Sequence, residues 1–96
     1  MNPKYVAYYI QDENPIYIIG RKDGIGAYNQ QQIVDWIYST KHHFPEGGAG
    51  KWFINLEAFP SNNEIQEFLS GEKSHLFMGC VWKNNDYISL HVEKLT

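Results

Sequence analysis

The chain has 96 residues, of which 43% are hydrophobic and 16% aromatic, and its formal net charge is −3 at pH 7. This composition excludes a disordered chain and predicts one domain with an aromatic-rich core. The negative charge disfavours direct binding to nucleic acid, which needs a basic face, and it favours a basic protein partner.

The cellular compartment is predicted from the cysteine content and from the apolar runs. Cys80 is the only cysteine, so no internal disulfide can form, which fits a reducing cytosol. The N-terminal residues are too polar for a signal peptide, and no apolar run approaches the ~20 residues of a membrane span. We therefore expect a cytoplasmic protein without membrane contact.

A β-hairpin is predicted at the start of the chain. Residues 5–10 have the pattern of a first strand. Residues 16–20 have the pattern of a second strand that is apolar on both sides, so we expect it to be well covered. The turn between them spans residues 11–15 and is marked by the pair Asn14 and Pro15.

A helix is predicted after a polar loop over residues 21–28. Asn29 is its expected N-cap, because the side chains and amides of Asn29 and Gln32 can form a reciprocal capping box. Pro45 disfavours helical geometry at the residue before it, so the helix should end near His42.

A third strand is predicted at residues 51–58. A second helix is predicted after it and ends at a glycine. Ser61 and Glu64 have the spacing of a capping box. Gly71 suits the left-handed position that closes a helix.

A second hairpin is predicted at the C-terminal end, with strands at 75–83 and 87–94 and a turn at 84–86. The element order is then ββαβαββ over residues 1–96. This order predicts a single α+β domain with a mainly antiparallel sheet and two helices packed on one face. Strand order stays open, and a third strand parallel to a neighbour is an alternative.

No spacing in the chain is typical of a catalytic, metal or cofactor site, so we expect neither an enzyme nor a bound cofactor. Nucleophilic cysteines need a nearby base, and His75 and His91 on the flanking strands could approach Cys80. Burial of Cys80 as a small hydrophobic side chain is the favoured interpretation. His75 and His91 are isolated in the sequence, and we expect no metal site. Strand alternation groups Cys80 with an apolar set, namely Leu76, Met78 and Trp82.

A ligand-binding domain is one alternative function. Arg21 and Lys22 are the only adjacent cationic pair, and they precede a helix whose N-terminus could attract an anion. Their loop lacks the glycine pattern of a P-loop or a dinucleotide fingerprint, so a plain turn is favoured. In this alternative the ligand lies in a pocket between the sheet and the 21–28 and 45–51 loops, where Arg21 and Lys22 hold an anion.

Acidic and tyrosine residues indicate a partner-binding surface. Residues 52–96 carry the whole acidic excess, and tyrosine is frequent in interface hot spots. Glu64 and Glu67 share one side of the second helix, where two like charges gain nothing locally. The predicted partner-binding residues are Glu57, Glu64, Glu67, Glu72, Tyr8 and Tyr87.

Size, acidity and aromatic content are those of small proteins that neutralise a partner, such as bacterial toxin-immunity proteins, an analogy that no specific residue carries. Our first hypothesis is an immunity-protein-like inhibitor that covers a cationic surface, such as the active site of a toxin nuclease. A second hypothesis is a phage-encoded anti-defence inhibitor. A third is a homodimer that forms through an edge strand.

Overall fold

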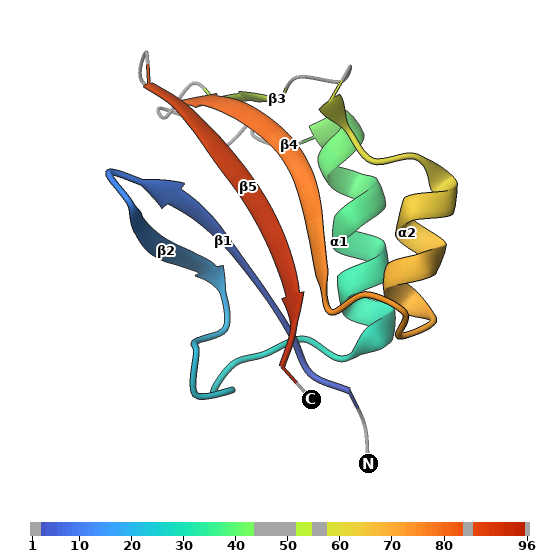
Figure 1. Cartoon of the computed structure of the whole chain (residues 1–96). Coiled ribbons are helices and arrows are strands. Elements are labelled where there is room, and N and C mark those ends of the chain that lie inside the picture. The colour runs from blue at the N-terminus through green and yellow to red at the C-terminus, as the bar shows by residue number, and fades with distance from the viewer. Residues whose placement is uncertain (1–2, 44–51, 55–57, 84–85, 96) are drawn as a thin grey trace.

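The chain forms a five-stranded antiparallel sheet with two helices on one of its faces (Figure 1). The computed structural model describes residues 3–43, 52–54, 58–83 and 86–95. In chain order the elements are β1 (Tyr5–Gln11), β2 (Asn14–Ile19), α1 (Gln30–His43), β3 (Trp52–Ile54), α2 (Asn62–Leu69), β4 (His75–Lys83) and β5 (Asp86–Lys94). The predicted α+β class, the ββαβαββ order and the placement of both helices on one face are confirmed.

The strands lie in the order β2-β1-β5-β4-β3, and each neighbouring pair is antiparallel. The first and last strands of the chain are therefore neighbours at the centre of the sheet, where Tyr5 pairs with Lys94 and Ile10 with Ser89. The alternative with a parallel third strand is not adopted, because β3 pairs antiparallel with β4. No helix among the described residues is long and apolar enough to cross a membrane.

The hydrophobic core lies between the helices and the sheet face that they cover. Ile33 and Ile37 of α1 and Ile65 and Phe68 of α2 have no exposed surface. The ring of Tyr5, on β1, packs edge-on against Phe68, with 5.6 Å between the ring centroids. The other buried members of this cluster are Ala7, Tyr9, Ile19, Leu76, Met78, Ile88, Leu90 and Val92.

The first hairpin turns earlier than its sequence predicts. Asp12 and Glu13 are the two turn residues, and both have positive φ, 51° and 67°, as two-residue hairpin loops require. Asn14 and Pro15 are the first residues of β2, so the prediction that they mark the turn is wrong. Pro15 is tolerated in this strand because β2 is an edge of the sheet.

The prediction that the second strand is well covered is also wrong. Ile16 and Ile18 are 39% and 37% exposed, and only Ile19 is buried. An apolar sequence pattern does not show how many neighbours a strand has, and β2 has a neighbour on one side alone.

Both predicted helix starts are confirmed. The Gln32 amide donates to Asn29 Oδ1 at 2.8 Å, and the Asn29 amide donates to Gln32 Oε1 at 2.9 Å. Ser61 and Glu64 form the same reciprocal pair at the start of α2. The first helix ends at His43, one residue later than predicted.

The predicted ends of the second helix, the last strand and the third strand can also be compared with the structure. Gly71 has φ +94°, and its amide donates to the Phe68 carbonyl, so it closes α2 as predicted. Asp86 belongs to β5 rather than to the preceding turn, whose residues 84–85 lie outside the described ones. β3 is the described part of the strand that the sequence predicts at residues 51–58. Ala58, the last residue of that prediction, lies in a short helical turn.

Replacing Ser61 with alanine should lower the free energy of unfolding by about 1 kcal/mol. The Glu64 amide would lose the hydroxyl oxygen that accepts its hydrogen bond at 3.2 Å. Chemical denaturation of Ser61→Ala and wild type measures the difference. Ser74→Ala, at an exposed serine outside the helix, is the control and should change stability by less than about 0.5 kcal/mol. Equal stability of Ser61→Ala and wild type would show that the cap contributes nothing.

Candidate functional site

The sheet face opposite the helices carries a cluster of aromatic, histidine and acidic side chains, which we call the open face. Strand alternation assigns residues of β1, β4 and β5 to it, because their neighbours along these strands belong to the core. Tyr17 of β2 is assigned by its pairing with Tyr8. Tyr8, for example, lies between the buried residues Ala7 and Tyr9. The open-face residues with described side chains include Tyr8, Ile10, Tyr17, His75, Phe77, Cys80, Ser89, His91 and Glu93.

A β-bulge in β4 decides which residues of that strand lie on the open face. Phe77 pairs with His91, but the next pair is Gly79 with Leu90, so Met78 is the extra residue. Met78 is fully buried in the core. Because of this extra residue, the residues of β4 after Met78 lie on the face opposite to the one that simple alternation predicts. Cys80 therefore lies opposite Ser89, on the open face.

The prediction that Cys80 is buried beside Leu76 and Met78 is wrong. Its side chain is half-buried, and it lies on the face opposite to both of those residues. The physical reason is Gly79, whose φ of +101° is a conformation that other residues rarely adopt. A Cβ atom there would also lie 3.0 Å from the Ala58 carbonyl oxygen, so the bulge needs glycine for space as well.

A second irregularity, in β2, brings another tyrosine onto the open face. Ala7 pairs with Ile19 and Tyr8 pairs with Tyr17, so Ile18 is the extra residue between them. Tyr17 consequently lies directly across from Tyr8. The two ring centroids are 5.2 Å apart, with 45° between the ring planes.

These two bulges align a row of rings across four strands. The Tyr8 ring stacks on the His91 ring, with centroids 5.3 Å apart and 17° between the planes. The Phe77 ring lies 5.5 Å from the same imidazole on its other side along the sheet. The row from Tyr17 to Phe77 therefore runs from β2 over β1 and β5 to β4, and Phe77 at its end is 43% exposed.

A carboxylate is held within this aromatic row. The Tyr8 hydroxyl donates a hydrogen bond to Glu93 Oε1 at 3.0 Å. Burial, followed by this hydrogen bond and the charge of Glu93, raises the pKa of Tyr8 to about 12. Burial and the same carboxylate also raise the pKa of Tyr17. Both hydroxyls are therefore protonated donors at neutral pH.

His91 is the centre of a second set of contacts. Its Nδ1 shares a hydrogen bond with His75 Nε2 at 2.8 Å, and its Nε2 shares one with Ser89 Oγ at 2.8 Å. Burial and the neighbouring His75 lower the pKa of His91, while Glu93 opposes the shift. Although His75 and His91 are isolated in the sequence, β4 and β5 bring them together.

A chain of hydrogen bonds runs from Ser89 to His91 and on to His75. In a catalytic site, a nucleophile, its base and an orienting group are connected in the same order. Acyl transfer further needs hydrogen-bond donors placed for an oxyanion, and these are often backbone N–H groups. Here β5 lies between β1 and β4, so the ladders on its two sides use its amides.

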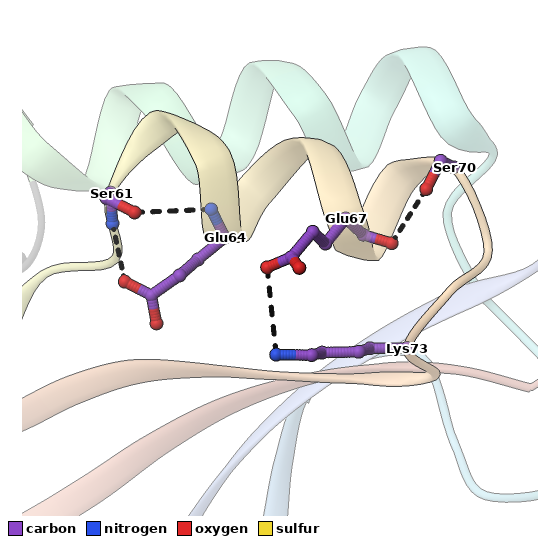
Figure 2. A network of polar contacts seen from close by, with 5 residues as sticks. All are labelled: Ser61, Glu64, Glu67, Ser70 and Lys73. Atoms are coloured by element: carbon purple, nitrogen blue, oxygen red, sulfur yellow. Dashed lines mark hydrogen bonds and ion pairs between the residues drawn. The ribbon is translucent and has the colours of Figure 1, made fainter.

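Three of the acidic residues predicted for partner binding lie elsewhere: Glu64 and Glu67 on α2 (Figure 2) and Glu72 shortly after it. The Glu64 carboxylate accepts a hydrogen bond from the Ser61 amide at 3.0 Å, and that bond lowers the pKa of Glu64. Glu67 Oε1 lies 3.7 Å from Lys73 Nζ, so Glu67 has a cationic neighbour on the exposed surface. Glu67 and Glu72 line a shallow depression together with Asn63, Gln66 and Ser70.

The structure does not bring all the predicted partner-binding residues together. Glu64, Glu67 and Glu72 lie on the helical side, whereas Tyr8 lies on the open face. Tyr87 pairs with Trp82 in the β4–β5 ladder, but its side chain lies outside the described ones. Glu57 also falls outside the described residues.

The structure gives little support to the possible anion site at Arg21 and Lys22. Arg21 Nη2 lies 3.1 Å from Asp23 Oδ2, and both side chains are exposed, so the guanidinium already has an acidic neighbour. The Gly24 amide donates to the Arg21 carbonyl, which makes this segment a local turn, as predicted. Residues 45–51, the other predicted side of a ligand pocket, are outside the described part of the chain.

Comparisons with known proteins do not connect the open face to a family: no protein-family model, no curated sequence and no solved structure matches this chain. Sequence reasoning missed Tyr17, Phe77, Ser89 and Glu93 as members of the cluster. Gly79 is a signal that could have placed Phe77 opposite His91, because an isolated glycine within a predicted strand often marks a bulge.

Proposed function

We propose that this protein is a binding protein that blocks a basic surface of a protein partner, as toxin-immunity proteins and phage anti-defence inhibitors do. In this proposal the open face makes the contact, and the acidic residues of α2 steer the partner before contact. The observation that carries it is the row of rings from Tyr17 to Phe77 with Glu93 held inside it.

The aromatic row supports a protein contact that uses cationic side chains. Tyrosine provides large contact area at low entropic cost and is enriched in interface hot spots. A guanidinium group can stack on a tyrosine ring while it donates to a carboxylate. Tyr8, Tyr17 and Glu93 place these two kinds of acceptor side by side.

The charge distribution supports a basic partner over a nucleic acid. Aromatic sheet faces also stack nucleobases, but such faces add cations that follow the phosphate backbone. None of the open-face residues within the strands that have described side chains is lysine or arginine, and Glu93 adds a negative charge. The formal net charge of −3 acts in the same direction.

In this proposal the two groups of predicted residues have different roles. Glu67 and Glu72 lie on the other side of the domain from Tyr8, so a small contact surface cannot include both groups. Charges outside a contact still change the rate of encounter, because electrostatic steering acts over the screening length. Glu67 should then affect association, and Tyr8 should affect dissociation.

Electrostatic steering is tested by measuring how the association rate depends on salt concentration and on the charge at Glu67. The partner is first captured from a lysate of the source cells with the wild-type protein and identified by mass spectrometry. Its association rate should then fall several-fold between 0.01 M and 0.1 M salt, because the screening length falls from about 30 Å to about 10 Å. Glu67→Lys should slow association at low salt and flatten this dependence.

Glu13→Lys is the matched control, since it makes the same charge change at the exposed β1–β2 turn, away from α2. We expect a smaller effect from it than from Glu67→Lys. An association rate that depends neither on salt nor on Glu67→Lys would contradict the steering by α2.

A further inference from the structure

The two imidazoles that are paired on the open face have ring nitrogens that the proposed function does not use. His75 is exposed at the start of β4, and His91 is half-buried on the central strand β5. Their facing nitrogens, His75 Nε2 and His91 Nδ1, are 2.8 Å apart. Two imidazole nitrogens that converge in this way are the beginning of a metal-binding site.

Ser89 prepares one of the two nitrogens for a metal. With its proton on Nε2, His91 donates to Ser89 Oγ at 2.8 Å, and the lone pair of Nδ1 then points toward His75. Histidines that bind metals usually donate their other ring N–H to an oxygen, which fixes the tautomer and the orientation of the ring. Ser89 supplies that oxygen here.

We propose that His75 Nε2 and His91 Nδ1 together bind a divalent transition-metal ion of the zinc class. Imidazole is a preferred ligand of Zn²⁺, Ni²⁺ and Cu²⁺, whereas Mg²⁺ and Ca²⁺ require oxygen ligands. Without metal, neutral His75 donates its single proton from Nε2 to His91 Nδ1. On metal binding this proton moves to His75 Nδ1 by exchange with solvent, so both facing nitrogens offer a lone pair and both rings stay neutral.

The distance between the two nitrogens is close to what a metal requires. Zn–N bonds of about 2.0–2.1 Å at a tetrahedral angle place two nitrogens about 3.3 Å apart. The observed 2.8 Å must therefore open by about 0.5 Å, which a small rotation of the exposed His75 ring provides. Glu93 pairs with His75 in the ladder, and its negative charge lies on the same face.

Among the described residues, the two histidines are the metal ligands that this proposal uses. No group of three His, Cys, Asp or Glu side chains in the described part of the chain is placed to hold a metal. The remaining coordination positions are therefore open to water or to a donor from another molecule. Such a site resembles a catalytic metal site in its open positions and differs from a closed structural site.

Titration of the purified protein with ZnCl₂ by isothermal calorimetry tests the site. We expect one Zn²⁺ per chain and no response to MgCl₂. His75→Ala and His91→Ala should each lower the Zn²⁺ affinity at least about tenfold, and Ser89→Ala should lower it less, through loss of ring orientation. The double variant His42→Ala, His43→Ala is the matched control and should bind Zn²⁺ like the wild type.

The nitrogen resonances of the histidine rings provide a second measurement that needs no variant. Addition of Zn²⁺ to the wild type should shift His75 Nε2 and His91 Nδ1 and leave the rings of His42 and His43 unchanged. Failure of the wild type to bind Zn²⁺ would overturn the proposal. So would binding that survives His75→Ala, or a shift confined to His42 and His43. None of these outcomes depends on whether the protein partner exists.

Discussion

Phe68→Ala is expected to lower the free energy of unfolding by about 3–5 kcal/mol. Phe68 has no exposed surface, lies in the core between α2 and the sheet, and packs edge-on against Tyr5 at 5.6 Å. Alanine would lose the transfer free energy of the ring and leave a cavity. A domain of this size is stable by about 5–15 kcal/mol, so the loss is a large share of the total. Urea denaturation followed by circular dichroism measures it.

Phe77→Ala is the matched control, because it removes the same ring from the open face, where the side chain is 43% exposed. We expect a loss below about 1 kcal/mol. Equal losses for the two variants would show that Phe68 does not lie in a closed core, and the assignment of covered and open faces would then be wrong.

Tyr8→Ala is expected to weaken partner binding by about 2 kcal/mol or more, which is roughly 30-fold in Kd. Tyr8 lies at the centre of the aromatic row, contacts Tyr17 and His91, and donates to Glu93. Its removal takes away contact area and frees the carboxylate that a cationic partner would meet. The effect should appear mainly as a faster off-rate with little dependence on salt, measured by surface plasmon resonance.

Tyr38→Ala controls for the loss of any exposed tyrosine, since Tyr38 is 38% exposed on α1, on the helical side. Its Kd should stay within about twofold of wild type, less than the tenfold change that 1.4 kcal/mol would give. A larger loss of affinity for Tyr38→Ala than for Tyr8→Ala would move the contact surface to the helices.

The sequence predicts the fold well because its signals are local. Asn29 with Gln32, and Ser61 with Glu64, define helix starts through contacts three residues apart. Gly71 defines a helix end in the same way. Each of these contacts is complete within one turn of chain, so the residues themselves contain the information.

The candidate site is predicted poorly because it depends on register. One extra residue in β4, Met78, reverses the face on which every later residue of that strand lies. Cys80 therefore moves from the predicted core to the open face. The pairing of His75 with His91 joins residues sixteen positions apart through a strand pairing that no local pattern specifies.

The most direct test of the proposed contact surface is cross-saturation by nuclear magnetic resonance in the complex with the captured partner. Saturation of the unlabelled partner attenuates signals of the labelled protein only where the two molecules touch. We predict attenuation at the rings of Tyr8, Tyr17 and Phe77 and none at Asn63 or Glu67. Attenuation along α2 with unchanged signals from the three rings would contradict the proposal that the open face binds the partner.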